Sequence, residues 1–154
     1  MDTTAHDAAP ARLRNAPIWL MSQVTAHAHR LVWEAFAATD DRRYHYALLA
    51  ALEEYGPASQ AALGRRCGID RSDVVAALNE LADRGLVTRS PDSADRRRNI
   101  VSVTPEGRRH LEWLDGALGR VQDELLAGIS TDEREHLVRL LHRVLAHHAP
   151  RRAE

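Results

Sequence analysis

The hydrophobic period of this chain changes in one stretch, and elsewhere it is the period of an α-helix. Apolar residues recur at the spacing of an α-helix on both sides of residues 86–103. Within that stretch, Leu86–Arg89 and Ile100–Val103 have the composition of short strands, and a charged loop separates them. The pattern therefore predicts a mainly α-helical fold that carries one small β-hairpin.

The helices before the hairpin are bounded by proline, glycine and capping residues. We expect a helix over residues 13–38, bent or restarted near Pro17, because proline cannot donate a hydrogen bond inside a helix. Asp40 is placed as the N-cap of a second helix over residues 41–54, which the following Gly-Pro pair ends.

Two short helices follow, separated by a tight turn at a glycine. Ser59 caps the first, which ends at Cys67, and Asp70 caps the second, which covers residues 71–84. Gly68 provides the left-handed conformation that stops the first helix. This arrangement predicts a helix-turn-helix, in which the first helix braces the second.

The C-terminal part is patterned for two longer helices. Thr104 caps the first of them and is followed by a proline, which the first helical position tolerates. Leu and Val recur at helical spacing over residues 111–125, the pattern of a helix that packs on another helix or in the core of its own chain. Ser130 and Glu133 form a capping box that starts the last helix, over residues 131–147.

Charge is distributed unevenly along the chain, although the formal net charge is only −1. Residues 56–110 carry 10 Arg and 7 Asp or Glu, whereas the segments on either side are net acidic. All 21 basic residues are arginine, whose planar guanidinium group suits phosphate. An acidic frame around a basic centre would direct an anionic polymer to that centre.

The basic centre has a geometry that suits double-stranded DNA. The N-terminal side chains of the second helix of a helix-turn-helix enter the major groove, where arginine can bind guanine through two hydrogen bonds. Asp73 would accept a hydrogen bond from cytosine N4 or hold Arg71 in place. An arginine at the hairpin tip would fit the narrow, electronegative minor groove. The candidate DNA contacts are Ser59, Gln60, Arg71, Ser72, Asp73, Arg96, Arg97 and Arg98.

Residues 69–107 resemble the MarR family of winged-helix regulators. The most specific part is DRRRNIVSVTPEG at residues 95–107, where the family shows Asp-Arg-Arg, a strand and then Leu-Thr-x-x-Gly. Val103 stands where the family usually has leucine. The order of predicted elements over residues 13–147 also matches, so the resemblance covers most of the chain.

The resemblance implies that Asp95 orients Arg97 in the minor groove and that a homodimer binds a pseudo-palindromic operator. Two apolar terminal helices that a small domain cannot cover alone favour the same dimer. The interlocking helices of the family would correspond to residues 13–38, 111–127 and 131–147. Such regulators mostly repress transcription, and they release DNA when a small aromatic or phenolic ligand, an oxidant or a metal acts on them.

The predicted organisation follows from these assignments. Residues 41–104 form the winged helix-turn-helix that binds DNA, and residues 13–38 and 105–147 form the helical dimerisation region. Residues 1–12 and 148–154 are expected to be flexible, because the first lack helical periodicity and the last follow the final helix.

The resemblance also places an effector pocket between the dimer helices and the winged domain. An indole wall with an arginine and two imidazoles suits an aromatic anion. The alternative is that the tryptophans belong to the core and that Arg30 is solvated. The pocket candidates are Trp19, Gln23, His27, Arg30 and His45.

Cys67 and the histidines are the remaining reactive groups. A single cysteine excludes an intramolecular disulfide, and Cys67 is expected to be an ordinary buried thiol rather than an oxidation sensor. Glu106 and His110 have the i,i+4 spacing of a helical metal site, with His45 expected nearby. We predict no metal and no other cofactor, and a zinc-responsive regulator is the alternative.

Several classes of function are disfavoured by motifs that the sequence lacks. It has no Ser-His-Asp arrangement at an elbow motif, no glycine-rich phosphate loop and no HExxH, so we expect no enzyme. No stretch approaches the roughly 20 apolar residues of a membrane span, and the N-terminal segment has no secretory pattern. We therefore expect a cytoplasmic, nucleoid-associated protein. A winged-helix protein-interaction module that binds no DNA is the alternative function.

Overall fold

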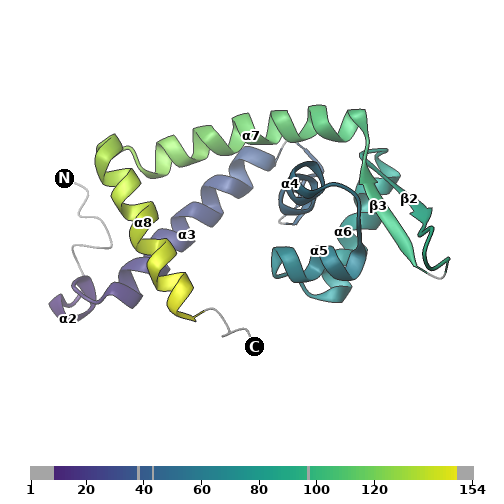
Figure 1. Cartoon of the computed structure of the whole chain (residues 1–154). Coiled ribbons are helices and arrows are strands. Elements are labelled where there is room, and N and C mark those ends of the chain that lie inside the picture. Colours follow the sequence, from purple (N-terminus) through teal and green to yellow (C-terminus); the bar gives the residue numbers. More distant parts are fainter. Residues whose placement is uncertain (1–8, 38, 43, 97, 149–154) are drawn as a thin grey trace. The chain divides into compact units, whose positions relative to one another are not determined.

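The computed structural model describes residues 9–37, 39–42, 44–96 and 98–148, and it divides the chain into two compact units (Figure 1). Residues 29–119 form what we call the winged unit, and residues 1–28 with 120–154 form the terminal unit. The elements are α2 (Ala11–Arg14), α3 (Pro17–Phe36), α4 (His45–Tyr55), β1 (Ala58–Ser59), α5 (Gln60–Cys67), α6 (Arg71–Asp83), β2 (Val87–Pro91), β3 (Asn99–Val103), α7 (Pro105–Leu125) and α8 (Thr131–His148).

The winged unit is built around a core of aliphatic side chains. Helices α4, α5 and α6 contribute most of this core, and the first turns of α7 complete it. Leu111 and Leu114 lie in the core, so the first half of the predicted apolar stripe packs within its own chain. Each buried leucine contributes about 1.5–3 kcal/mol to folding, and this burial holds the helices together. The least exposed apolar side chains are Leu48, Leu49, Leu52, Leu63, Leu78, Leu81, Leu114, Val74 and Val101.

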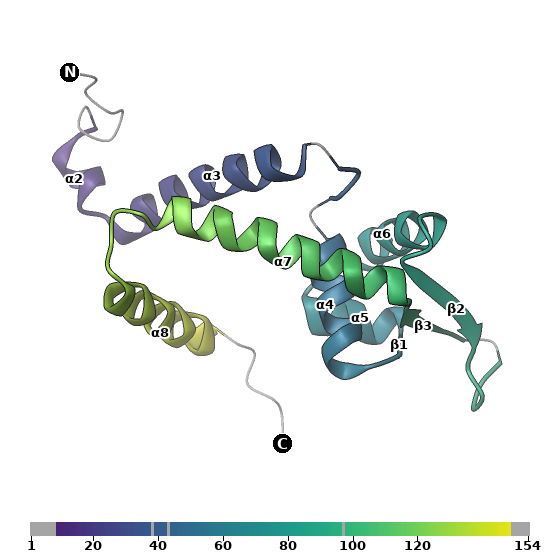
Figure 2. The same ribbon diagram turned by 90° about the horizontal axis from the view of Figure 1, so that it is seen from above.

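A three-stranded antiparallel sheet completes the winged unit. Its strand order is β1-β3-β2, with Ala58 paired to Val101 and Val87 paired to Val103. The predicted hairpin is confirmed as β2 and β3, and its outer end projects away from the helices (Figure 2). Pro91 ends edge strand β2, the kind of position at which a sheet tolerates proline. No sequence pattern predicts β1, because a strand of 2 residues is too short to alternate.

Local capping sets most of the helix starts as predicted. Ser59 Oγ accepts a hydrogen bond from a first-turn N–H of α5 at 3.3 Å, and Thr104 Oγ1 accepts one from α7 at 3.0 Å. The capping box of α8 is also confirmed, because Ser130 N–H donates to the Glu133 carboxylate at 2.7 Å and Glu133 N–H donates to Ser130 Oγ at 3.3 Å. The backbone N–H of Ser130 also holds the pKa of Glu133 below its usual value.

One predicted helix start is wrong. The sequence places an N-cap at Asp40, but α4 begins at His45. The neighbouring Asp41 turns inward and binds Arg84 and His110. The segment before α4 therefore satisfies tertiary partners, and the helix starts only after it.

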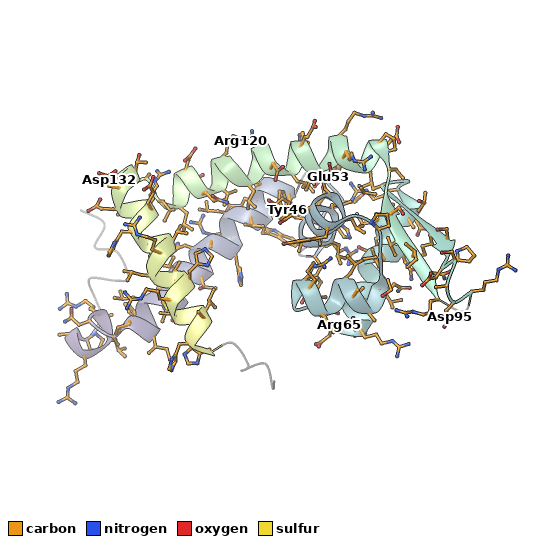
Figure 3. The ribbon with its side chains drawn as sticks, viewed as in Figure 1. Tyr46, Glu53, Arg65, Asp95, Arg120 and Asp132 are labelled. Atoms are coloured by element: carbon orange, nitrogen blue, oxygen red, sulfur yellow. The ribbon has the colours of Figure 1, made fainter. Side chains whose placement is uncertain are left out.

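Polar contacts at the surface tie α4 to α7 (Figure 3). The Tyr46 hydroxyl donates to the Asp115 carboxylate at 2.9 Å, and Arg108 Nε donates to the Glu53 carboxylate at 2.7 Å. These contacts lie outside the aliphatic core, and exposed pairs of this kind add little to the free energy of folding. Their main effect is to set the direction of α7 relative to α4 within the winged unit.

The terminal unit presents many apolar side chains to solvent. The expected break near Pro17 is confirmed, since α2 ends at Arg14 and α3 begins at Pro17. Ile18 is 77% exposed and Leu145 is 67% exposed. No residue of α8, which the structure describes over its whole length, is buried. Exposed apolar surface of this extent is typical of helices that associate with another surface.

Candidate nucleic-acid interface

The first turn of α6 presents its polar side chains to solvent. Gly68, in the left-handed conformation with φ 64°, ends α5, and the buried Ile69 leads the chain into α6. Arg71, Ser72 and Asp73 are all exposed. The opposite face of the helix is buried through Val74, Ala77, Leu78 and Leu81. The predicted helix-turn-helix is thus confirmed, and the three predicted base-reading residues lie on its solvent-facing side.

The hairpin loop carries exposed arginines at the far end of the sheet, where Figure 3 labels Asp95. Backbone hydrogen bonds close this loop: Arg98 N–H donates to the Asp95 carbonyl at 2.9 Å, and Asp92 N–H donates to the Arg98 carbonyl at 2.8 Å. Arg96 and Arg98 are exposed. Arg97 lies outside the described residues, so its orientation by Asp95 stays a prediction.

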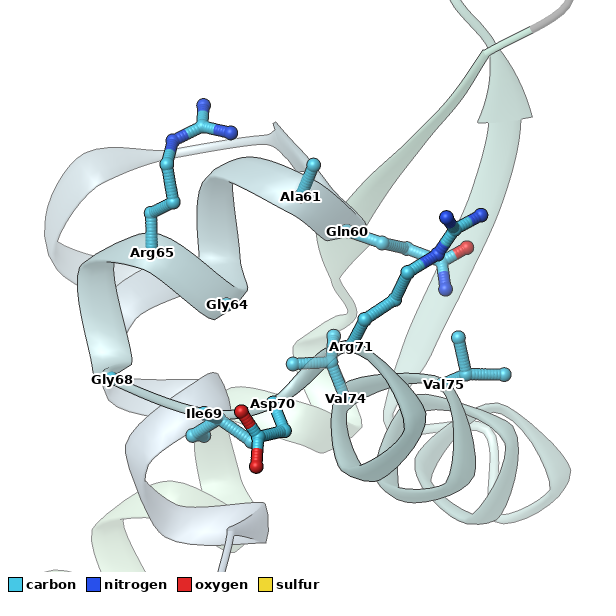
Figure 4. A pocket seen from close by; sticks show the side chains of 10 residues that line it. All are labelled: Gln60, Ala61, Gly64, Arg65, Gly68, Ile69, Asp70, Arg71, Val74 and Val75. Atoms are coloured by element: carbon cyan, nitrogen blue, oxygen red, sulfur yellow. The ribbon is translucent and has the colours of Figure 1, made fainter.

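A groove of about 710 Å³ opens between α5 and α6 (Figure 4). Gln60 and Arg71 extend from the starts of α5 and α6, and Arg65 extends from the other end of α5. Gly64 permits this close packing, because a Cβ at that position would lie 3.0 Å from the backbone oxygen of Ile69. The groove is lined by Gln60, Ala61, Gly64, Arg65, Gly68, Ile69, Asp70, Arg71, Val74 and Val75.

Ser59 and Gln60 are less accessible than the candidates on α6. Ser59 is 8% exposed and its hydroxyl accepts the capping hydrogen bond of α5. Because a hydroxyl can donate while it accepts, Ser59 keeps a donor for a phosphate oxygen. Gln60 is half-buried and lines the groove.

Two further exposed arginines lie within the basic segment, residues 56–110. Arg65 on α5 and Arg89 on β2 are exposed, and no sequence motif singles them out. They contribute to the excess of arginine over residues 56–110, which is a property of composition and belongs to no motif. About half to two-thirds of protein–DNA hydrogen bonds go to phosphate and sugar, so both arginines are candidates for phosphate contacts.

The five effector-pocket candidates are divided between the two units. Trp19, Gln23 and His27 belong to the terminal unit, whereas Arg30 and His45 belong to the winged unit. Arg30 is exposed and pairs with a glutamate one turn further along α3 at 3.1 Å. A pocket shared by all five residues therefore stays a prediction.

His45 is the most buried of these candidates, with a side chain that is 0% exposed. The N–H of Arg42 donates to Nδ1 at 3.1 Å, which leaves the ring proton on Nε2, and Nε2 donates to the Glu80 carboxylate at 2.8 Å. Burial lowers the pKa of His45, although the Glu80 carboxylate acts in the opposite direction, so the ring is neutral at pH 7. Both ring nitrogens are occupied, and neither is left for an effector.

Cys67 is half-buried, and burial raises the pKa of its thiol despite the nearby Arg66. The thiol therefore stays protonated at neutral pH, which makes it a poor oxidation sensor.

Among the described residues, no group of three or more His, Cys, Asp or Glu is placed to hold a metal ion. Glu106 pairs with an arginine of its own helix, and His110 binds a buried aspartate. In the described part of the chain, no helix has the length and apolar character needed to cross a membrane.

Comparisons with known proteins point to one family. The model of the MarR family matches residues 40–98. A protein named as a transcriptional regulatory protein for the hcr operon of Thauera aromatica is 33% identical over 99 residues, which are 64% of this chain. The chain spans 60% of the length of that curated relative.

Two solved structures are similar over most of both chains. A probable transcriptional regulator from Pseudomonas aeruginosa is 32% identical, with a TM-score of 0.78 over 86% of this chain and 99% of that one. The PcaV transcriptional regulator from Streptomyces coelicolor, solved with its natural ligand, is 30% identical, with a TM-score of 0.75 over 90% and 97%. These relatives are transcriptional regulators rather than enzymes. From its winged helix-turn-helix and from these matches, the chain belongs to the MarR family.

Proposed function

We propose that this protein binds double-stranded DNA as a homodimer and regulates transcription in response to a small molecule. The observation that carries the proposal is the exposed polar turn at the start of α6, backed by a buried face, in the same unit as the arginines of the hairpin. In a winged helix-turn-helix, that turn enters the major groove while the hairpin reaches the minor groove.

The candidate contacts have two different roles. Arg71 and Ser72 stand where side chains reach base edges, so they would contribute to sequence preference. Arg65, Arg96 and Arg98 are exposed cations around them, and they would bind phosphates or enter the minor groove. The acidic flanking segments would keep the DNA on this basic surface.

The exposed apolar side chains of the terminal helices support a homodimer. Val144 and Leu145 lie exposed on α8, and Ile18 and Val24 lie exposed on α3. A second copy of the chain would bury these side chains, through helices within residues 13–38, 111–127 and 131–147. A dimer would also place two recognition helices in successive major grooves about 34 Å apart, which a pseudo-palindromic operator requires.

The response to a ligand rests on the relatives and on the candidates in α3. The PcaV structure contains its natural ligand. Trp19, Gln23, His27 and Arg30 together offer an indole, hydrogen-bond donors and a cation, which suit a small aromatic anion. A ligand that prefers a dimer with wrongly spaced recognition helices would shift the population away from DNA and relieve repression.

Binding of the purified protein to the DNA upstream of its own gene tests this proposal. We expect saturable binding that resists competitor DNA and that weakens by orders of magnitude between about 50 and 200 mM salt. Aromatic acids would then be screened for release of the DNA. Binding that competitor DNA abolishes at every salt concentration would instead favour a winged-helix module for a protein partner.

Arg71→Ala is the variant that tests the recognition helix. We expect a loss of roughly 1–3 kcal/mol in operator binding and relaxed preference at one base position, because a bidentate guanine contact is removed. Arg109→Ala is the matched control, since it removes an exposed arginine of α7 that pairs within its own helix. Equal affinities of the two variants would contradict the placement of α6 in the major groove.

A further inference from the structure

A fully enclosed carboxylate joins three parts of the winged unit. The Asp41 side chain, from the segment between α3 and α4, is 1% exposed. Arg84, the residue that follows α6, donates from Nη1 to Asp41 Oδ1 at 2.9 Å. His110, in the second turn of α7, lies with Nε2 at 2.8 and 2.9 Å from the two Asp41 oxygens. The end of α6 and the start of α7 therefore meet at one negative charge.

The negative charge of Asp41 favours the arrangement of α6 and α7 in which Arg84 and His110 both contact its carboxylate. Burial alone would raise the pKa of Asp41, but hydrogen bonds from His110 and Arg84 outweigh burial and lower it, so the carboxylate stays ionised. A buried charge that loses one partner costs several kcal/mol. Any displacement of α7 from α6 that separates His110 from Arg84 is therefore opposed.

Thr104, at the start of α7, joins the same two helices independently of Asp41. Thr104 Oγ1 donates to the Gly85 carbonyl at 2.7 Å, and Thr104 N–H donates to the Leu86 carbonyl at 3.0 Å. A Cβ at Gly107 would overlap the carbonyl oxygen of Leu86. The first turn of α7 thus rests directly on the turn that follows α6.

The charged groups around this point come from every neighbouring element. The segment before α4 and α4 itself provide Asp41, Arg42 and His45; α6 and its end provide Glu80 and Arg84; α7 provides His110. Trp113 of α7 stacks on the His110 ring, with centroids 5.9 Å apart. The cluster is continuous from the last turn of α6 to the second turn of α7.

We propose that Asp41 is a positioning residue for DNA recognition, because through Arg84 and His110 it fixes the C-terminal end of α6 on α7. The proposal rests on the proposed function of α6 as the DNA-reading helix. The 13 residues of α6 separate this cluster from the exposed N-terminal turn by about 20 Å. A tilt of a few degrees at the Asp41 end would therefore move Arg71 by about 1 Å. Operator affinity would depend on a carboxylate that contacts no DNA.

Asp41→Asn tests the proposal, and Asp115→Asn is its matched control. Both remove one carboxylate charge, but Asp115 joins α4 to α7 through Tyr46, whereas Asp41 joins the end of α6 to α7. We expect Asp41→Asn to weaken operator binding about tenfold and Asp115→Asn to change it less than twofold. Asp41→Asn should leave the slope of log affinity against log salt unchanged, because no phosphate contact is lost.

Hydrogen exchange without DNA separates this proposal from the proposed function. In Asp41→Asn, amides in the last turn of α6 and the first turn of α7 should exchange at least about tenfold faster than in Asp115→Asn, while the start of α6 changes less. If the wild type bound no DNA, the proposed function would fail, and exchange would still test the link between the two helices. Unchanged exchange, or unchanged affinity in a wild type that binds DNA, would overturn the role of Asp41.

A pair of substitutions at His110 keeps the test decisive if Asp41→Asn does not fold. His110→Gln retains an N–H that can donate to Asp41, whereas His110→Ala removes the donor. We expect His110→Ala to lower operator affinity several-fold more than His110→Gln does at equal fractions of folded protein. Equal losses would show that the ring only fills space, and they would overturn a positioning role exerted through this hydrogen bond.

Discussion

At the scale of single residues, the winged unit depends on charged and polar groups that are buried in pairs. His45 is neutral and bound at both ring nitrogens, and Asp41 is ionised and bound by Arg84 and His110. Unpaired, either group would cost a few kcal/mol or more. Acid disturbs these pairs, because a protonated His45 donates from both ring nitrogens and a protonated Asp41 loses its negative charge.

His45→Gln is predicted to flatten the acid dependence of stability. Burial holds the pKa of folded His45 below 6.5, so the unfolded chain takes up this proton at higher pH than the folded protein does. The contribution of His45 to the free energy of unfolding is therefore complete above about pH 6.5, and it is lost as the pH drops through the lowered pKa. Asp41 acts in the same direction at lower pH, since its folded pKa lies below 3.8.

Urea unfolding between pH 8 and pH 5 measures this effect. The Gln variant should be about 1–3 kcal/mol less stable at pH 8, through weaker buried hydrogen bonds, but should lose less stability than the wild type as the pH falls. His136→Gln, at an exposed position of α8, is the control and should follow the wild type. Parallel curves for all three proteins would show that His45 does not carry the acid dependence.

At the scale of elements, local rules explain the helix starts and tertiary packing explains their exceptions. Ser59, Thr104 and the Ser130–Glu133 capping box act within one turn of chain, so the sequence predicts them correctly. The start of α4 is predicted wrongly because Asp41 binds Arg84 and His110, which lie 43 and 69 positions further along the chain. Short-range patterns contain no information about partners at such separations.

Gly107→Ala is predicted to disturb the junction of α6 and α7. A methyl group there would overlap the backbone carbonyl of Leu86 and crowd the side chain of Val103, and because the carbonyl is backbone the helix itself must shift. We expect a loss of about 1–3 kcal/mol in the free energy of unfolding. Thermal or urea unfolding of the purified variant measures it.

Gly119→Ala is the control, because it makes the same substitution in the same helix where a Cβ would meet nothing within 4 Å. It should stabilise the protein by up to about 1 kcal/mol, since alanine favours helix over glycine. A destabilised Gly119→Ala together with a neutral Gly107→Ala would contradict the packing described for α7.

At the scale of the whole molecule, the terminal helices expose apolar side chains that the proposed homodimer would bury. α8 has no buried residue along its length, although its hydrophobic residues recur at helical spacing. Such a helix gains stability mainly by packing its apolar face. This surface is the basis on which we propose the homodimer.

Leu141→Arg is predicted to convert the proposed dimer to monomer. It would place a charge among the exposed apolar side chains of α8, and burial of an unpaired charge in an interface costs several kcal/mol. Size-exclusion chromatography with light scattering measures the mass. His142→Arg introduces the same side chain at an adjacent polar position of the helix and should remain a dimer. Two monomeric variants, or two dimeric ones, would contradict an interface on this face.

Features that depend on neighbouring residues are predictable from the amino-acid sequence: the helical periods, the hairpin, most caps, and the polar first turn of α6. These are fixed by interactions within a few residues, and so they also revealed the MarR family. Three-dimensional packing alone shows that Asp41 is buried against Arg84 and His110, that His45 is closed to ligands, and that Gly107 lies against Leu86. Those facts follow from packing between distant segments, where burial and charge pairing depend on three-dimensional neighbours that no local pattern encodes.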